Sequence, residues 1–259
     1  MRWDFSLQME KTCDPYPHAK FWALRNEMEN IMKLLDLFCG AGGAGRGYMD
    51  AGFDVTGVDI EPQPDYPGHF IQGDAIAYLA AHGQEYDAIH ASPPCQASSA
   101  LTKGTNKGRE YLNLIPATRA LLALHDKPTV IENVQGSDLR RDLTLCGEMF
   151  GLGVIRHRYF ETSGFTALPL AHEPHRGKVR GWRHGTYYDG PYVAVYGDGG
   201  GKGSVKEWQD AMDIHHTSNR KSIAEAIPPA FARFVGGQIM TRLESIALLA
   251  SMREEIKIG

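Results

Sequence analysis

The sequence lacks the features that would mark a membrane, secreted or disulfide-rich protein. Its longest unbroken apolar run is the seven residues Ala75–Ala81, whereas a membrane-spanning helix needs about 20. No basic stretch followed by an apolar one opens the chain, so no secretion signal is predicted. The four cysteines are far apart and form no C-x-x-C pair: Cys13, Cys39, Cys95 and Cys146. This spacing excludes a disulfide framework and a zinc ribbon, and we expect a cytoplasmic protein with no membrane partner.

The sequence also lacks an excess of positive charge. The net charge is −4 and the pI is near 6.3, which argues against a protein that coats nucleic acid indiscriminately but allows a local basic patch. With 42% hydrophobic and 22% charged residues, the composition is that of a globular protein rather than a disordered or fibrous one. A chain of 259 residues accommodates one large domain, or one domain with a modest second lobe.

Apolar runs and helical patterns alternate between residues 33 and 134. The predicted strands are Lys33–Phe38, Phe53–Ile60, Tyr86–Ala91 and Pro128–Val134, and the predicted helices are Gly45–Ala51 and Tyr111–His125. This alternation predicts an α/β fold with a Rossmann-like, doubly wound and mostly parallel sheet. Ligands of such sheets bind at the carboxyl ends of the strands, and the loops with candidate functional residues follow strands.

A glycine-rich turn follows the first predicted strand. Residues 36–43 read Asp-Leu-Phe-Cys-Gly-Ala-Gly-Gly, and Asp59 stands at the end of the second predicted strand. Glycines after a strand allow a ligand to approach the backbone closely, and a helix N-terminus attracts negative charge. A carboxylate at the end of the next strand can bind both hydroxyls of a ribose. The pair indicates a nucleoside-type cofactor, although a tight β-to-α turn alone would also explain the glycines.

Three further motifs lie on strands or follow them. Residues 91–96, Ala-Ser-Pro-Pro-Cys-Gln, place Cys95 in a proline-fixed loop, which suits a thiolate nucleophile, although a lone cysteine is more commonly buried and inert. Glu132 ends another apolar strand, where a partly desolvated carboxyl could act as a general acid, cap a helix or form an ion pair. Arg156 and Arg158 could hold a planar base edge or form a solvated surface pair.

In this order, the motifs Asp-Leu-Phe-Cys-Gly-Ala-Gly-Gly, Pro-Pro-Cys-Gln, Glu-Asn-Val and Arg-x-Arg resemble those of the DNA (cytosine-5) methyltransferase family. The resemblance covers Met32–Phe160 and returns at Ile223–Ile239. It implies the class I fold that binds S-adenosylmethionine. It also implies methyl transfer to C5 of a cytosine that has been flipped out of double-stranded DNA.

The resemblance implies a role for each residue of the catalytic motifs. Cys95 would attack C6 of the base, and Glu132 would supply a proton or hydrogen bond to N3. After methyl transfer to C5, loss of the C5 proton would expel Cys95. Arg158 would hold the base and polarise its O2, with Arg156 as the other arginine of the motif, and Asn133 would brace the loop.

The same matching assigns the cofactor contacts. Phe38 would pack on the cofactor, Asp59 would replace a more usual glutamate as the ribose ligand, and Asp74 would accept from the adenine amino group. Ile60 would cover the adenine, and Pro94 would lie near the donor methyl. The predicted cofactor-binding residues are Asp36, Phe38, Cys39, Gly40, Ala41, Gly42, Gly43, Asp59, Ile60, Asp74 and Pro94.

The resemblance also divides the chain into regions. Residues 1–32 form an extension with helical spacing over Phe21–Met32, and residues 33–160 bind the cofactor and catalyse. Residues 161–221 form a small, irregular target-recognition lobe, and 222–259 return to the catalytic domain as a helical segment. The short lobe predicts a short target site.

Basic and aromatic residues in the lobe suit phosphate contacts and base stacking, although a solvated loop with a small aromatic core fits equally well. The predicted nucleic-acid contacts are Gln96, Ser99, Arg176, Lys178, Arg180, Arg183 and Lys202. No metal site is predicted, because His172-Glu173-Pro174-His175 and His215-His216 lack a metalloprotease spacing.

The chain departs from the family pattern at three points. Ser98 stands where phenylalanine is usual, Val154 stands where glutamine is usual, and Ala224–Pro229 replaces the closing Gly-Asn-x-Val. These changes concern the DNA contacts and the last cofactor contacts more than the core reaction. Two alternatives stay open: C5 methylation of an RNA cytosine or a free nucleotide, and a catalytically silent, cofactor-sensing DNA-binding protein. A monomeric methylase of a restriction-modification system is expected.

Overall fold

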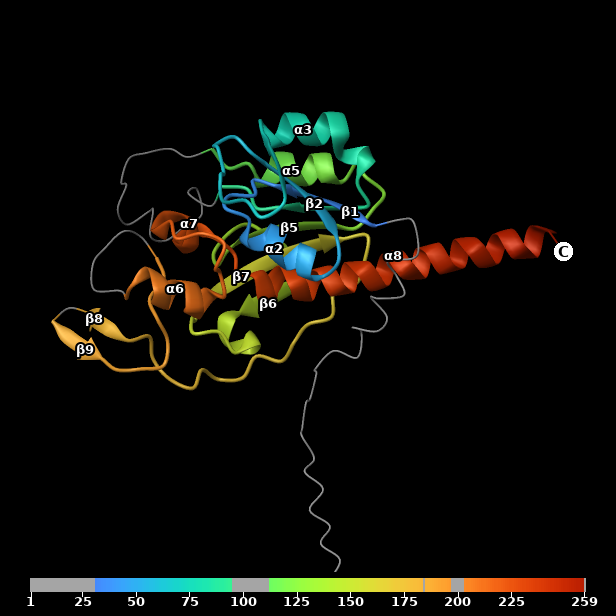
Figure 1. Cartoon of the computed structure of the whole chain (residues 1–259). Coiled ribbons are helices and arrows are strands. Elements are labelled where there is room, and N and C mark those ends of the chain that lie inside the picture. The colour runs from blue at the N-terminus through green and yellow to red at the C-terminus, as the bar shows by residue number, and fades with distance from the viewer. Residues whose placement is uncertain (1–30, 95–111, 184, 197–202, 259) are drawn as a thin grey trace, which may run out of the picture. The chain divides into compact units, whose positions relative to one another are not determined.

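The computed structural model describes residues 31–94, 112–183, 185–196 and 203–258. The chain divides into two units, Met1–Ile31 and Met32–Gly259, and nearly all described residues belong to the second (Figure 1). The helix expected at Phe21–Met32 lies outside the described residues, apart from Ile31 and Met32, which are not helical.

Seven strands form one mixed sheet in the order β3-β2-β1-β4-β5-β7-β6. They are β1 Lys33–Leu37, β2 Asp54–Asp59, β3 His69–Gln72, β4 Ala88–Ala91, β5 Thr129–Val134, β6 Leu143–Cys146 and β7 His157–Ser163. The first five strands in sequence pair in parallel, and β7 runs antiparallel to both β5 and β6. The predicted doubly wound, mostly parallel sheet is confirmed.

The central strands are buried on both faces, as is usual where helices cover a parallel sheet. Leu34, Leu35 and Leu37 of β1 are fully buried, and all four residues of β4 are buried. The edge strand β3 is only partly covered. The sheet core therefore lies along β1 and β4.

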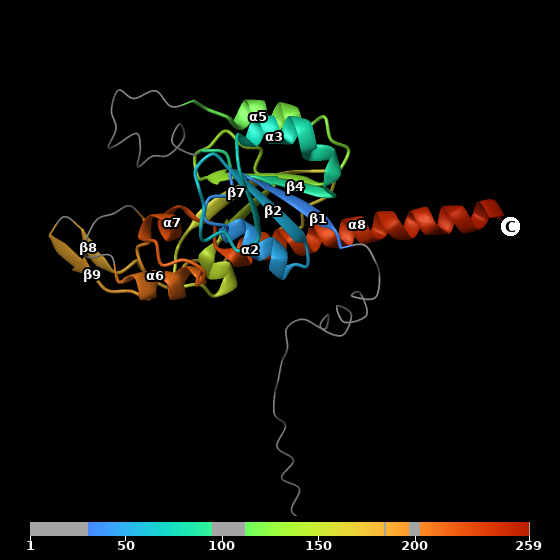
Figure 2. The same ribbon diagram turned by 45° about the horizontal axis from the view of Figure 1, so that its top comes forward.

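Six helices accompany the sheet among the described residues. They are α2 Gly43–Asp50, α3 Ala75–His82, α5 Ile115–Leu122, α6 Val205–Met212, α7 Arg220–Glu225 and α8 Pro229–Ile258. Figure 2 shows α3 and α5 together on one face of the sheet, and α2 and the first part of α8 on the other. Two short 3₁₀ helices, Gly83–Glu85 and Gly147–Phe150, and a hairpin of β8 Gly181–Arg183 and β9 Thr186–Tyr188 complete the fold.

The end of the chain differs from the continuous helical spacing expected from Ile223 onward. Asn219 caps α7 by accepting a hydrogen bond from the Ser222 N–H (3.1 Å), and α7 ends at Glu225. Pro228 then disfavours helix at the preceding residue, whereas Pro229 suits the first position of α8. Two helices therefore replace the predicted one.

None of the helices in the described part of the chain has the continuous apolar length that a bilayer crossing requires.

The predicted helix Tyr111–His125 is also shorter in the structure. It spans Ile115–Leu122, with Pro116 in its first turn, and Tyr111 lies outside the described residues. The Asn113 side chain accepts a hydrogen bond from the Ile115 N–H (3.1 Å), which satisfies the first backbone donor of the helix.

Candidate functional site

The carboxyl ends of four parallel strands bring the sequence motifs to one edge of the sheet. The glycine-rich turn follows β1, Asp59 ends β2, Ser92-Pro93-Pro94 follows β4, and Glu132 and Asn133 lie near the end of β5. Because these strands are neighbours, motifs far apart in sequence become adjacent in space. This edge is the candidate site.

Asp59 holds the glycine-rich turn in place. Its Oδ2 accepts from the Gly40 N–H (2.9 Å) and its Oδ1 from the Glu61 N–H (3.0 Å). Phe38 and Gly42 adopt positive φ angles of 56° and 84°, which glycine tolerates and phenylalanine rarely does. Gly43 then begins α2. The turn is thus a fixed cradle rather than a loose loop.

Open space flanks Asp59. A Cβ placed on Gly40 or on Gly73 would meet no atom within 4 Å among the described residues. The side chain of Ile60, next in sequence to Asp59, is 65% exposed. An exposed apolar surface beside a carboxylate and bare backbone is what an adenosine moiety would cover.

The loop that holds Asp74 lies alongside Asp59. The Gly73 N–H donates to the Asp59 carbonyl oxygen (2.9 Å). The Asp74 side chain caps α3, since its Oδ1 accepts from the Ala77 N–H (2.9 Å). Asp74 therefore lies next to a residue that is hydrogen-bonded to Asp59, and one of its carboxylate oxygens caps the helix.

The Asp36 side chain does not face the open space. It is fully buried, and its Oδ2 accepts from the Tyr66 hydroxyl (3.1 Å). Burial raises the pKa of Asp36 to about 7, and the Tyr66 hydrogen bond only partly offsets this effect. The Asp36 side chain therefore supports the turn from beneath, and a role of Asp36 in cofactor binding stays a prediction. Cys39 and Ala41 are also buried.

His216 is a contact of the turn that the sequence did not indicate. Its Nε2 lies 2.8 Å from the Ala41 carbonyl oxygen. The next residue, Thr217, donates through its hydroxyl to Asp65 Oδ2 (2.6 Å). Together they fix the segment before α7 against the cofactor turn, and no local sequence pattern marks a pairing across 175 residues.

Glu132 and Arg158 form a buried ion pair on adjacent strands. Arg158 Nε lies 2.9 Å from Glu132 Oε1, and the two side chains are 14% and 5% exposed. Burial raises the pKa of Glu132, and the charge of Arg158 and a hydrogen bond from Ser92 partly offset this. Oε1 has no aligned hydrogen-bond donor within the described ranges. A carboxyl group in this state can give a proton or hydrogen bond to a ring nitrogen.

Asn133 braces the loop that leads to Cys95. Its Nδ2 donates to the Pro93 carbonyl oxygen (2.8 Å) in a buried position. The Ser92 N–H donates to the Leu37 carbonyl oxygen (3.0 Å), so the loop is tied to β1 as well. The loop is described as far as Pro94. The predicted nucleophile Cys95, and the predicted DNA contacts Gln96 and Ser99, lie outside the described residues.

His90 is a second residue that the sequence did not single out. It is fully buried between the Tyr48 hydroxyl (2.9 Å from Nδ1) and the Ser92 hydroxyl (2.8 Å from Nε2). Burial lowers its pKa from 6.5 to about 3. A neutral histidine thus orients Ser92, which in turn donates to Glu132. The only sequence signal was a histidine at the end of an apolar strand.

The low pKa of His90 predicts a stability effect at acid pH. Unfolded His90 binds a proton as pH falls below 6.5, but folded His90 does not until about 3, so the stabilisation that is present above 6.5 is lost on acidification. Between pH 7 and 5 the loss is about 2 kcal/mol. Urea unfolding at both pH values should show this loss in the wild type and a smaller one in His90→Gln, because other titrating groups are common to both proteins. Equal losses would contradict the prediction.

Arg156 has a different role from the predicted catalytic one. Its guanidinium donates to the backbone carbonyls of Ala224, Ala226 (2.8 Å) and Val195 (3.4 Å). It thereby fixes the segment after α7 to the start of β7. Its charge still lowers the pKa of Glu132, as the smallest of the offsetting effects. These contacts make Arg156 a positioning residue.

Two predicted DNA-binding cations are engaged with carboxylates. Arg176 Nε lies 2.6 Å from Glu148 Oε1, and Arg180 pairs with Glu207. Lys178 Nζ lies 5.3 Å from the centre of the Tyr188 ring. The side chain of Arg183, and all of Lys202, lie outside the described residues.

Aromatic rings are exposed on the β8–β9 hairpin. Trp182 is 71% and Tyr187 52% exposed, and their ring centres are 5.6 Å apart in an edge-to-face arrangement. Exposed large aromatic side chains of this kind are uncommon unless a partner covers them. In both views the hairpin lies toward the same end as α6 and α7 (Figures 1 and 2).

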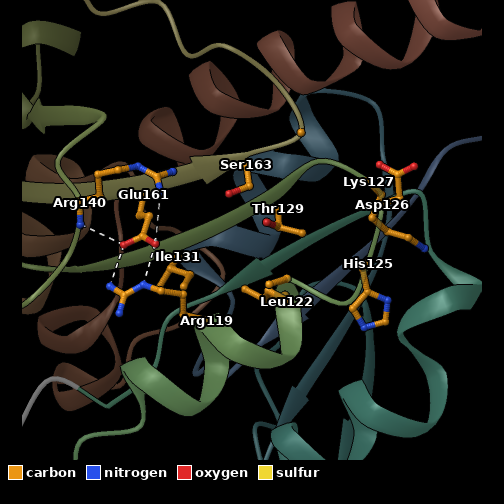
Figure 3. A pocket seen from close by; sticks show the side chains of 12 residues that line it. Arg119, Leu122, His125, Asp126, Lys127, Thr129, Ile131, Arg140, Glu161 and Ser163 are labelled. Carbon is orange, nitrogen blue, oxygen red and sulfur yellow. Dashed lines mark hydrogen bonds and ion pairs between the residues drawn. The ribbon is translucent and has the colours of Figure 1, made fainter.

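A separate cavity lies near the beginning of β5, away from this edge (Figure 3). Its volume is about 290 Å³, and Thr129 and Lys127 contribute to its lining. Beside it, Arg119 donates two hydrogen bonds of 2.8 Å to the carboxylate of Glu161. This ion pair holds α5 against β7 and so stabilises the fold. The cavity lining includes neither the glycine-rich turn nor Asp59, Glu132 or Asn133.

Comparisons of the sequence with known proteins find methyltransferases. The chain is 31% identical over 124 residues to the type II methyltransferase M.HgiGI of Herpetosiphon aurantiacus, an alignment covering 42% of this chain and 96% of that protein. It is also 31% identical over 124 residues to M.HgiDI of the same organism. That alignment covers 42% of this chain but 39% of M.HgiDI, so the chain spans well under half the length of this second relative. No family model matches the sequence.

The fold also has relatives among solved structures. A prophage-encoded protein of E. coli, described as a DNA modification methyltransferase, superposes with a TM-score of 0.55 at 14% identity. The match covers 82% of this chain and 99% of that one. At this identity the likeness concerns the fold alone, and it extends beyond the sheet into the part of the chain that follows β7.

Proposed function

The chain belongs to the type II methyltransferases, and from this membership we propose that it transfers a methyl group to C5 of a cytosine flipped out of double-stranded DNA. The family confirms the predicted cofactor, S-adenosylmethionine, which supplies an electrophilic methyl group. The buried Glu132–Arg158 pair, beside the loop that leads to Cys95, is the observation that carries the choice of cytosine C5.

The cofactor fits the residues around Asp59. The open space over Gly40 and Gly73 and the exposed Ile60 side chain suit an adenosine group, with Asp59 toward the ribose and Asp74 toward the adenine. In this proposal residues 33–160 bind the cofactor and catalyse, residues 161–221 select the target, and residues 222–259 complete the catalytic domain.

The reaction requires a nucleophile and a proton donor on one base. The Cys95 thiolate bonds to C6 while the protonated Glu132 donates to N3, so that the electron pair of the C5–C6 bond becomes available at C5. C5 takes the methyl group of S-adenosylmethionine, which leaves as S-adenosylhomocysteine. Loss of the C5 proton to a base then restores the double bond and releases the Cys95 thiolate, and N3 returns its proton to Glu132. Arg158 holds the Glu132 carboxyl and faces the base oxygen O2. Asn133 fixes the loop through Pro93.

The hairpin supports a nucleic-acid substrate. Trp182 and Tyr187 offer stacking surfaces, and Lys178 lies next to the hairpin over Tyr188. Because the relatives are type II methyltransferases, the proposed substrate is double-stranded DNA. The proposal also takes the protein to be a monomeric, cytoplasmic methylase of a restriction-modification system. RNA and free cytosine nucleotides are the substrates to be excluded by experiment.

Removal of the Trp182 ring should weaken DNA binding selectively. Trp182→Ala is expected to lower the affinity for a duplex about tenfold, since stacking contributes about 1–3 kcal/mol per base, and to leave the affinity for S-adenosylmethionine unchanged. Fluorescence anisotropy with a labelled duplex and calorimetry with the cofactor measure the two. Leu249→Ala, at a 53% exposed apolar position on α8, is the control. An equal loss in both variants would contradict a specific role of Trp182.

Nucleoside mass spectrometry tests the proposed function. Unmethylated duplex DNA, RNA and cytidine nucleotides are incubated separately with the protein and S-adenosylmethionine, then digested to nucleosides. The proposal expects 5-methylcytosine from DNA alone. Product from RNA or nucleotides only would overturn the substrate, and N4-methylcytosine or N6-methyladenine would overturn the chemistry. If no methylated base forms while calorimetry shows cofactor binding, a cofactor-sensing binding protein replaces the enzyme.

A further inference from the structure

Four potential metal ligands meet at the antiparallel edge of the sheet. Cys146 ends β6 and pairs directly with His157 at the start of β7. His172 and His175 approach from the segment that follows β7. One ligand atom from each of the four residues lies within 4.8 Å of all the others. The cluster lies on β6, β7 and the segment after β7, at the same end of the sheet as the carboxyl end of β5, and it shares no residue with the proposed methyl-transfer site.

The distances between the imidazoles suit a shared ion. His157 Nε2 and His172 Nε2 are 3.3 Å apart, and the two rings are stacked. Two nitrogens bound to one tetrahedral zinc at about 2.0–2.1 Å would lie roughly 3.3–3.4 Å apart.

His175 is oriented from behind by a carboxylate. Its Nδ1 lies 2.8 Å from Glu148 Oε2, and the other oxygen of Glu148 accepts from Arg176 Nε (2.6 Å). This contact places the Nδ1 proton toward Glu148 and leaves Nε2 as the ligand atom. A carboxylate that accepts from the far nitrogen of a histidine is the usual outer partner of a zinc ligand.

Cys146 is a buried thiol surrounded by backbone donors. It is fully buried and forms no disulfide. The backbone N–H groups of Glu148, Arg156 and Gly147 point at its sulfur. Such donors stabilise negative charge on sulfur, which a metal-bound thiolate carries.

We propose that Cys146, His157, His172 and His175 bind one zinc ion. One thiolate and three imidazoles are ligands that zinc prefers, and four protein ligands complete a tetrahedral site with no position left for a substrate. The ion is therefore structural. It fastens the beginning of the recognition lobe to β6 and to β7, the strand of Arg158, and this role does not depend on which base the protein methylates.

The sequence predicted no metal site, because the spacing of its histidine pairs matches no metalloprotease motif. The four ligands come from two strands and a loop, with spacings of 11, 15 and 3 residues, which match no common zinc motif. Their meeting depends on the antiparallel pairing of β6 with β7. Only the three-residue step between His172 and His175 is local.

Metal analysis of the untagged full-length protein tests the proposal. After incubation with zinc and removal of free ions by desalting, we expect one zinc per chain by plasma mass spectrometry. His172→Asn should lower the zinc affinity at least tenfold, and because His172 is exposed the variant should still fold, as circular dichroism would verify. The matched control is His215→Asn, at an exposed histidine outside the cluster, which should keep the zinc. A wild type without zinc, or a folded His172→Asn variant with unchanged affinity, would overturn the site.

Cobalt substitution tests the sulfur ligand. The wild type loaded with Co²⁺ should show the visible bands of a tetrahedral site and a thiolate-to-cobalt charge-transfer band. Cys146→Ser should lose the charge-transfer band, because this band requires a bond between a thiolate and the cobalt ion. If this band persists in Cys146→Ser, the sulfur comes from another cysteine and the proposed ligand set is wrong. Neither readout requires methyl transfer, so the zinc site and the proposed function can fail separately.

Discussion

Glu132→Gln is expected to lower kcat for DNA methylation by a factor of about 10³, within the usual 10²–10⁴ for loss of a general acid. The glutamine amide can still accept a hydrogen bond from the Ser92 hydroxyl and fills the same volume, but it cannot deliver a proton to N3. The affinity for S-adenosylmethionine should be unchanged, because the carboxyl lies on β5 and the proposed cofactor space lies around β1 and β2.

A buried carboxylate on the neighbouring strand provides a matched control. Glu161 of β7 is as buried as Glu132 (5% exposed side chain in each) and is also paired with an arginine, Arg119, but it borders the separate cavity of Figure 3. Glu161→Gln should alter stability and leave kcat within about twofold of the wild type. Single-turnover methylation at saturating cofactor measures both variants. Similar losses in the two would show that the Glu132 effect arises from general destabilisation.

Cys95→Ser is expected to abolish covalent attachment to DNA. A duplex with 5-fluorocytosine at the target has no C5 proton to lose, so after methyl transfer the wild type should stay bonded to C6 and survive a denaturing gel. Serine forms no such bond, because its hydroxyl is not ionised at neutral pH. Cys13→Ser, in the N-terminal unit, should form the adduct normally.

The remaining cysteines make this test specific. Cys39 is 7% exposed and Cys146 fully buried, and burial raises the pKa of both thiols, which suits neither for attack on a base. An adduct formed by Cys95→Ser would therefore contradict the assignment and direct attention to Cys13. Absence of an adduct in the wild type would contradict covalent catalysis itself.

The sequence predicted the parallel part of the fold because its strands carry two signals at once. β1, β2, β4 and β5 are apolar runs, and each of the four ends in or next to a distinctive loop or polar residue. β3 escaped notice because His69–Gln72 is a partly exposed edge strand without an apolar run. α3 follows Asp74 as a nearly uniform apolar stretch, Ala75–Ala81, in which no helical period stands out.

The sequence could indicate those site residues that lie within a recognisable motif and act close to it. Glu132 and Arg158, each predicted to act on the base, pair with one another, and Asn133 donates to the carbonyl oxygen of Pro93 in the loop before Cys95. The sequence could not reveal residues that act from a distance. His90 acts by orienting Ser92 through a hydrogen bond. Arg156 donates to the Ala224 carbonyl oxygen instead of pointing to the same place as Arg158. These tasks depend on tertiary distance, which spacing along the chain does not encode.

Three glycines of the cofactor region are constrained by one tyrosine ring. A Cβ on Gly45 would overlap the Tyr66 hydroxyl, a Cβ on Gly57 would overlap the ring itself, and a Cβ on Gly42 would overlap Pro67 and approach the ring. The glycines at 45 and 57 are therefore set by Tyr66 rather than by a ligand. In evolution these positions should change together: a smaller residue at 66 would release both glycines, at the expense of the hydroxyl that supports Asp36. Gly45 and Gly57 are thus explained by packing against Tyr66 inside the protein, and not by recognition of the cofactor.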